Sequence, residues 1–169
     1  MMNSTNRGLT ISAWRDEDTP EAIDIWNEVV REGVAFPQED ELDLDAGRAF
    51  FAAQSRTAIA RDRDGRALGL YILHPNNVGR CGHLCNASYA VASWARGRGV
   101  GEALVRDCLT QARALGFGVL QFNAVVATNI AALRLYEKLG FVRLGTIPRG
   151  FRLPDGHYAD IIPHYHTLC

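Results

Sequence analysis

The sequence predicts a mixed α/β (α+β) fold, in which a twisted sheet of about six or seven strands is flanked by helices. Two observations predict it. After residue 84, strand-like segments alternate with helix-like segments, which favours parallel neighbouring strands. Before residue 75, two strand-like segments flank Asp62-Arg63-Asp64-Gly65, a sequence typical of the turn between antiparallel strands. With 169 residues, 47% of them hydrophobic, the chain is expected to form a single domain over residues 1–169.

In the first half of the chain, the signals for the start and the end of a helix are the clearest. Thr19 suits the N-cap, Pro20 suits the first helical position, and Gly33 ends the helix after about Arg31. The segment at 34–45 is acidic and irregular. The predicted elements of this half are a strand at 9–14, helices at 19–31 and 46–54, and strands at 57–61 and 66–73.

In the second half, glycines mark the helix ends. Gly116 is expected to close one helix in a left-handed conformation, and Gly140 to close the next. Pro163 lies within the last apolar segment and predicts a bulge or an edge strand there. The predicted elements are strands at 84–91, 119–125, 141–147 and 158–168, with helices at 99–115 and 130–139.

Composition and charge exclude several classes of protein. The net charge is −1, but residues 1–60 hold twelve acids and five bases, whereas residues 61–169 hold seven acids and thirteen bases. The excess of basic residues after residue 60 favours a small polyanionic ligand, although a compositional bias would also explain it. Nothing in the composition indicates binding to nucleic acid. No apolar run is long enough for a membrane span, and the polar N-terminus predicts a cytoplasmic protein with reduced cysteines.

A glycine-rich segment, Arg96-Gly97-Arg98-Gly99-Val100-Gly101, joins a predicted strand to a predicted helix. Glycines let backbone N–H groups approach a ligand, and a helix N-terminus favours phosphate. The segment lacks the lysine of a P-loop, and its glycines are spaced too closely for the dinucleotide fingerprint. A phosphate-binding loop of another kind is therefore predicted; a glycine-rich turn with solvated arginines is the alternative.

The spacing Arg-x-x-Gly-x-Gly in this segment, followed by Asn129 and by Tyr136-x-x-x-Gly140-Phe141, resembles the GCN5-related N-acetyltransferase (GNAT) superfamily over residues 84–147. The resemblance implies a sheet that splays between its fourth and fifth strands. It also implies that the loop binds the pyrophosphate of acetyl-CoA and that Asn129 binds the pantetheine arm, with no metal cofactor.

The same resemblance assigns two catalytic groups. The backbone N–H at about Val91, which ends the fourth strand, would stabilise the developing oxyanion. The Tyr136 hydroxyl, near the thioester sulfur, would protonate the leaving thiolate, although an aromatic residue on a helix is often only part of the core. No glutamate stands on the fourth or fifth strand, so the base is expected to be an ordered water chain or an acid of the N-terminal helices, such as Glu28 or Glu32.

Three motifs carry a further resemblance over residues 73–160: His74-Pro75-Asn76-Asn77, Gly82-His83-x-Cys85-Asn86-Ala87-Ser88-Tyr89 and Gln121-Phe122-Asn123-Ala124-Val125-Val126. They resemble the fungal acetyltransferases that detoxify the proline analogue L-azetidine-2-carboxylate. This implies that Asn86 and Asn123, on neighbouring strands, hold the carboxylate end of a small amine. An internal amide network is the structural alternative. Cys81, His83 and Cys85 would lie on one strand face, but strand alternation spreads them too far apart for zinc.

The expected activity is acetyl-CoA-dependent N-acetylation of a small amino acid or a toxic amino-acid analogue. The alternatives are a phosphinothricin or methionine-sulfoximine acetyltransferase, a protein or peptide acetyltransferase, and a non-catalytic acyl-CoA sensor. The expected partner is therefore a small-molecule amine, without nucleic acid or membrane. Relatives in this superfamily are often dimers, so a homodimer is a possible assembly of this chain.

Overall fold

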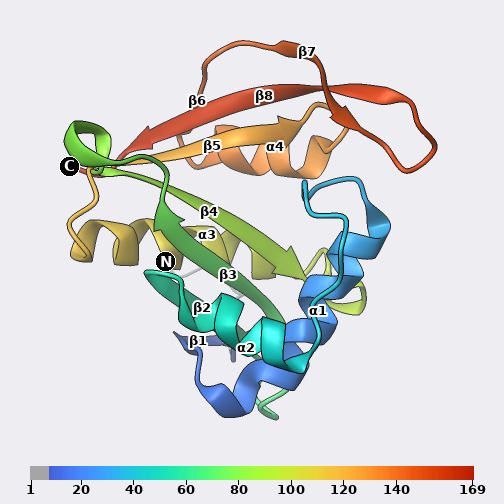
Figure 1. Cartoon of the computed structure of the whole chain (residues 1–169). Coiled ribbons are helices and arrows are strands. Elements are labelled where there is room, and N and C mark those ends of the chain that lie inside the picture. The colour runs from blue at the N-terminus through green and yellow to red at the C-terminus, as the bar shows by residue number, and fades with distance from the viewer. Residues whose placement is uncertain (1–7) are drawn as a thin grey trace.

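The computed structural model describes residues 8–169, and over this part of the chain the sheet has eight strands. They are β1 (Thr10–Ala13), β2 (Arg56–Arg61), β3 (Ala67–Pro75), β4 (Leu84–Val91), β5 (Val119–Val126), β6 (Val142–Arg143), β7 (Ile147–Arg152) and β8 (Tyr158–Thr167). Their order is β1-β2-β3-β4-β5-β8-β6, and β7 also pairs with β8. Only β4 and β5 run parallel, so the sheet is mixed, as predicted (Figure 1).

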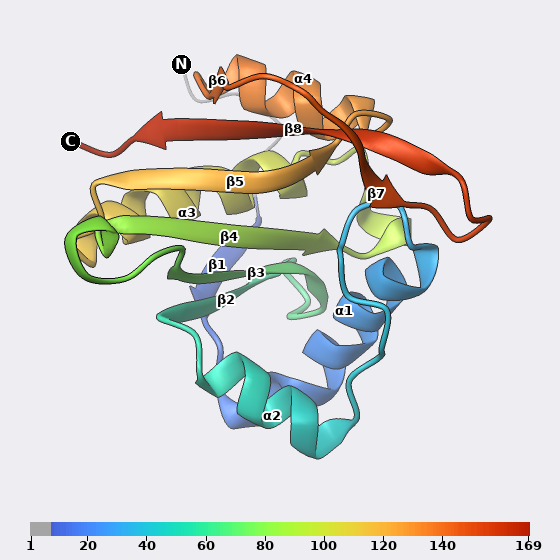
Figure 2. The ribbon, with the colours of Figure 1, turned by 45° about the horizontal axis from the view of Figure 1, so that its top comes forward.

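Between residues 8 and 169, four α-helices cover the two faces of this sheet. They are α1 (Thr19–Glu32), α2 (Leu44–Ala52), α3 (Val100–Ala114) and α4 (Ile130–Lys138). The helices α3 and α4 lie on one face, and α1 and α2 lie on the other (Figures 1 and 2). No helix between residues 8 and 169 is long and apolar enough to cross a membrane.

Aromatic packing joins α1 to α2 and to the segment that follows α1. Apolar residues recur along one stripe of α1, and the largest of them, Trp26, is almost fully buried. Its ring lies 4.4 Å from that of Phe36 and 5.0 Å from that of Phe50, between ring centroids. The segment at 33–43, which follows α1, is therefore fixed against the helix although it has no regular structure.

The C-terminal third departs from the prediction. The strand expected at 141–147 is reduced to the two residues of β6, because the chain leaves the extended conformation at Gly145, whose φ is 133°. The strand β7, which begins at Ile147, was not predicted. The bulge expected at Pro163 is confirmed, since the register between β5 and β8 shifts beside it. The edge position is wrong, because β8 lies between β5 and β6.

The sheet opens between its two parallel strands. The strands β4 and β5 pair only through Leu84 with Val119 and Cys85 with Leu120. Beyond these pairs they diverge, which Figure 1 shows as a widening gap towards the C-terminal end of β4. The splay expected between the fourth and fifth strands is therefore present, and it exposes backbone groups and side chains of both strands to the space between them.

Candidate active site

Two pockets meet in the gap between β4 and β5. The first, which we name the loop pocket, measures about 630 Å³ and is lined by the ends of α1 and β4, residues 95–97 and 99–101, and the start of α4. The second, the splay pocket, measures about 220 Å³ and lies between β4 and β5. Both are lined by Ala35, Tyr89 and Asn129, so the two spaces adjoin.

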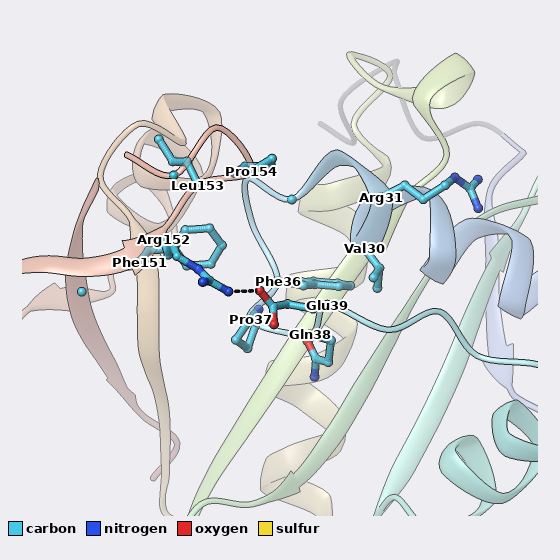
Figure 3. Close-up of a pocket in the computed structure, with 13 residues that line it drawn as sticks. Val30, Arg31, Phe36, Pro37, Gln38, Glu39, Phe151, Arg152, Leu153 and Pro154 are labelled. Atoms are coloured by element: carbon cyan, nitrogen blue, oxygen red, sulfur yellow. Dashed lines mark hydrogen bonds and ion pairs between the residues drawn. The ribbon is translucent and has the colours of Figure 1, made fainter. Parts of the chain in front are cut away.

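A third space, the hairpin pocket, measures about 690 Å³ and lies between the segment after α1 and the turn from β7 to β8. Phe36 and Pro37 line both this pocket and the splay pocket. The Arg152 guanidinium reaches across to the Glu39 carboxylate at 2.5 Å and joins the two walls (Figure 3). The hairpin pocket is therefore a larger, charged space beside the uncharged splay pocket.

The glycine-rich loop has a geometry that suits a phosphate group. Gly97 and Gly99 both have a φ of 77°, a conformation that residues with a side chain rarely adopt. A Cβ atom at either position would meet no atom within 4 Å, so the backbone faces open space. Gly99 is the N-cap of α3, and within residues 8–169 no side chain caps this helix. The unpaired N–H groups of its first turn are therefore available to a pyrophosphate.

The two arginines of the loop are placed differently. The Arg96 guanidinium lines the loop pocket, donates to the Glu32 carboxylate at 2.7 Å and to the Val91 carbonyl oxygen at 3.3 Å. Arg98 is exposed, lies outside the lining of the loop pocket, and its guanidinium is 5.8 Å from the centroid of the Trp94 ring. The structure thus brings Arg96 into the predicted site but leaves Arg98 beside it.

The backbone of Val91 points into the gap. The register pairs Gly69 with Val91, and the Ala92 N–H donates to the Leu68 carbonyl oxygen at 2.9 Å. Because hydrogen-bonded and non-hydrogen-bonded pairs alternate between antiparallel strands, the Val91 N–H points away from β3. It points towards β5, whose pairing with β4 has ended at Cys85. This N–H is placed to donate to a ligand in the gap.

Tyr136 and Asn129 belong to α4 and its N-terminus. The Asn129 side-chain oxygen accepts from the Ala132 N–H at 3.2 Å, which leaves its NH₂ group for the two pockets it lines. Tyr136 lines the splay pocket, and its ring packs on Phe122 at 4.5 Å and Phe141 at 5.2 Å between centroids. Burial raises the pKa of the Tyr136 phenol well above its usual range, so the hydroxyl keeps its proton at neutral pH.

Asn86 and Asn123 both line the splay pocket, so the two strand faces coincide as expected. The Asn86 oxygen accepts from the Ala87 N–H at 2.8 Å. The Asn123 oxygen accepts from the side-chain amides of Asn76, at 3.0 Å, and Gln121, at 3.1 Å. Since the oxygens are occupied within the chain, both asparagines offer mainly N–H donors to a ligand.

The splay pocket also has no charge of its own, since none of its lining residues, all of them within the described part of the chain, is charged. A ligand's charged group therefore meets amide dipoles rather than a counter-ion. The internal amide network that stood as the alternative is present as well, because Asn123 is bonded to Asn76 and Gln121.

The two acids suggested as the base are engaged elsewhere. The Glu28 carboxylate accepts from the Ser93 N–H at 3.0 Å, and hydrogen bonding by the Ser93 side chain, then by its backbone N–H, lowers the pKa of Glu28. Glu32 lines the loop pocket but is paired with Arg96. Neither acid lines the splay pocket, so neither is placed there to take the amine proton directly.

The expected strand face of Cys81, His83 and Cys85 does not form. Cys81 ends a short 3-10 helix (Gly79–Cys81), and His83 precedes β4, whose first residue is Leu84. Only Cys85 belongs to the strand, where it is buried. Within residues 8–169, no three His, Cys, Asp or Glu side chains are grouped so that they could hold a metal ion.

Some site residues escaped sequence reasoning. Tyr89 lines both the loop pocket and the splay pocket, yet alternation along β4 indicates only a face and not the gap. Asn76 follows β3 directly and contacts Asn123, 47 positions away, which no local pattern reveals. Its proximity to a predicted strand end was the one available signal.

Comparison with known proteins gives consistent matches. A model of the acetyltransferase (GNAT) family matches residues 12–141. The structure of a GCN5-related N-acetyltransferase from Kribbella flavida is 36% identical, with a TM-score of 0.88 over 95% of this chain and 98% of that one. The L-methionine sulfoximine/L-methionine sulfone acetyltransferase of Pseudomonas aeruginosa is 30% identical over 78% of this chain and 79% of its own length.

A fungal relative matches over a shorter stretch. The N-acetyltransferase aca1 of Schizosaccharomyces pombe is 40% identical over 101 residues, which are 59% of this chain and 48% of that protein. The chain thus spans about half the length of this curated relative.

Proposed function

Because the chain belongs to the GNAT acetyltransferase family, we propose that it transfers the acetyl group of acetyl-CoA to the amine of an α-amino acid, or of an amino-acid analogue, with a free carboxylate. The observation that carries the proposal is the pair Asn86 and Asn123. Their oxygens are satisfied within the chain, and both side chains line an uncharged pocket beside an uncapped, glycine-rich helix N-terminus.

For the co-substrate, the residues present fit acetyl-CoA. The open space before Gly97 and Gly99 and the N–H groups of the first turn of α3 suit a pyrophosphate. The loop pocket continues past Asn129, whose NH₂ group suits the amides of the pantetheine arm. When bound, acetyl-CoA supplies an acetyl group that is activated as a thioester.

The chain's own groups then serve the transfer. The Val91 N–H donates to the thioester carbonyl oxygen as negative charge develops on it. The Tyr136 hydroxyl, which burial keeps protonated at neutral pH, donates a proton to the leaving sulfur. Glu32 holds Arg96 and so fixes the loop against α1.

For the acceptor, the amide donors suit a carboxylate, which accepts hydrogen bonds but donates none. L-azetidine-2-carboxylate and L-methionine sulfoximine share this group, so the site supports both acceptors named by the resemblance and by the bacterial relative. The charged hairpin pocket beside Phe36 offers room for a side chain longer than that of the proline analogue. Methionine sulfoximine, which has such a side chain, is therefore the second candidate acceptor.

The test compares two substitutions of Asn123. Asn123→Ala removes one donor, whereas Asn123→Asp replaces it with a charge that repels a carboxylate. The KM for the amino-acid acceptor is expected to rise about tenfold in Asn123→Ala and further in Asn123→Asp, with the acetyl-CoA Kd and the melting temperature close to wild type. An unchanged KM in both variants would refute the carboxylate site.

A further inference from the structure

Asn76 and Asn123 form a closed pair of side-chain hydrogen bonds. The Asn76 NH₂ group donates to the Asn123 oxygen at 3.0 Å, and the Asn123 NH₂ group donates to the Asn76 oxygen at 2.7 Å. Such a reciprocal pair fixes the orientation of the two amides relative to each other, since reversing one amide alone sets oxygen against oxygen and N–H against N–H.

The pair is held firmly on both sides. The Asn76 backbone N–H donates to the Leu84 carbonyl oxygen at 2.8 Å, which ties the start of the β3–β4 connection to the first residue of β4. On the other side, the Gln121 side-chain amide donates to the Asn123 oxygen at 3.1 Å, which favours this orientation of the pair over the one with both amides reversed. Asn123 therefore receives two hydrogen bonds at its oxygen and keeps one N–H unused by the chain.

This geometry decides what the splay pocket recognises. An amide that presents N–H favours a carboxylate, whereas the same amide turned by 180° presents an oxygen, which favours a carboxamide and repels a carboxylate. We propose that Asn76 is a positioning residue that fixes the amide of Asn123 with its N–H towards the acceptor and so selects carboxylate acceptors over carboxamide acceptors. This inference rests on the proposed function, because it assumes that Asn123 contacts the acceptor.

The adjacent Asn77 provides a matched control. Its side-chain oxygen accepts from the Val78 N–H at 2.8 Å, it is exposed, and it lines neither the loop pocket nor the splay pocket. Asn77→Ala thus removes the same side chain from the same connection without touching Asn123. Asn76→Ala keeps the backbone bond to Leu84, so the connection itself is expected to stay in place.

The experiment measures kcat/KM of the purified protein with L-azetidine-2-carboxylate and with L-methionine sulfone, each as the free acid and as the carboxamide. The preference ratio, acid over carboxamide, is expected to fall about tenfold in Asn76→Ala and to stay at the wild-type value in Asn77→Ala. The fall is expected in KM more than in kcat, with an unchanged acetyl-CoA Kd, because Asn76 touches neither the loop nor Tyr136.

Asn76→Asp extends the test should the alanine variant fold poorly. An aspartate at 76 still accepts from the Asn123 N–H but no longer donates to its oxygen, so the preference ratio is expected to fall here too. Asn77→Asp adds the same charge, and its ratio of acid to carboxamide is expected to stay higher than that of Asn76→Asp.

The outcomes distinguish a failure of the proposed role of Asn76 from a failure of the proposed carboxylate site. If wild type prefers acids and Asn76→Ala keeps that preference, or loses both activities in equal proportion, the role of Asn76 is refuted and the proposed function stands. If wild type itself does not prefer acids, the carboxylate site fails and the inference fails with it.

Discussion

Gly99→Ala is expected to change both the stability of the protein and its affinity for acetyl-CoA, for two different physical reasons. Gly99 has a φ of 77°, and a Cβ atom there would meet no protein atom within 4 Å. The substitution therefore costs backbone strain without a clash, about 1–2 kcal/mol. For a chain of this size each kcal/mol shifts the melting temperature by about 2–4 °C, so a fall of about 2–8 °C is expected.

The same substitution is expected to weaken acetyl-CoA binding for a reason unrelated to its effect on stability. The new methyl group projects into the open space where the pyrophosphate is proposed to approach the backbone, so the Kd measured by titration calorimetry is expected to rise at least about tenfold, or about 1.4 kcal/mol. Gly116→Ala is the matched control, because Gly116 ends the same helix with a φ of 89° and is equally free of neighbours. Its melting temperature should fall alike while its Kd stays at the wild-type value. An unchanged Kd in Gly99→Ala, or an equal rise in both variants, would show that the pyrophosphate does not bind against Gly99.

Three further predictions concern single side chains. Tyr136→Phe should lower kcat by about 10²–10⁴-fold in steady-state assays at constant acetyl-CoA Kd, and full turnover would reduce Tyr136 to a packing role. Glu28→Gln weakens the bond to the Ser93 N–H and should lower the melting temperature while leaving the acidic limb of the kcat/KM pH profile in place; loss of that limb would make Glu28 the base. Burial lowers the pKa of His164, so the unfolded chain takes up a proton that the folded chain resists once the pH falls below about 6.5. Wild-type stability should therefore fall between pH 7 and 5.5 in thermal unfolding, with a smaller fall in His164→Leu; equal falls would contradict the assignment.

Local signals predicted the elements that carry the loop. Gly33, Gly116 and Gly140 all adopt the left-handed conformation expected at helix ends. The strand at 84–91 and the helix that follows the glycine-rich segment are confirmed nearly to the residue. These boundaries depend on neighbouring residues in the chain, which is why the sequence is sufficient for them. The GNAT fold and family followed from the order of the motifs and are confirmed.

Long-range contacts explain what the sequence could not predict. The strand β7 begins with Ile147 and carries Arg152, which reaches Glu39, 113 positions earlier, to border the hairpin pocket. The engagement of Arg96 with Glu32 likewise depends on how α1 packs beside the loop. The sequence around an arginine does not show whether its guanidinium is free to bind a phosphate or is paired with a carboxylate.

The most direct test of the account is the rate of CoA thiol release when purified protein is mixed with acetyl-CoA and a panel of acceptors. The panel holds L-azetidine-2-carboxylate, L-methionine sulfoximine, the carboxamide of each, and a short peptide with a free N-terminus. The account predicts thiol release well above the acceptor-free rate with at least one free acid, and at least about tenfold less with its carboxamide. Release with the peptide alone, or equal release with acid and carboxamide, would contradict an amino-acid acetyltransferase that reads a carboxylate through Asn86 and Asn123.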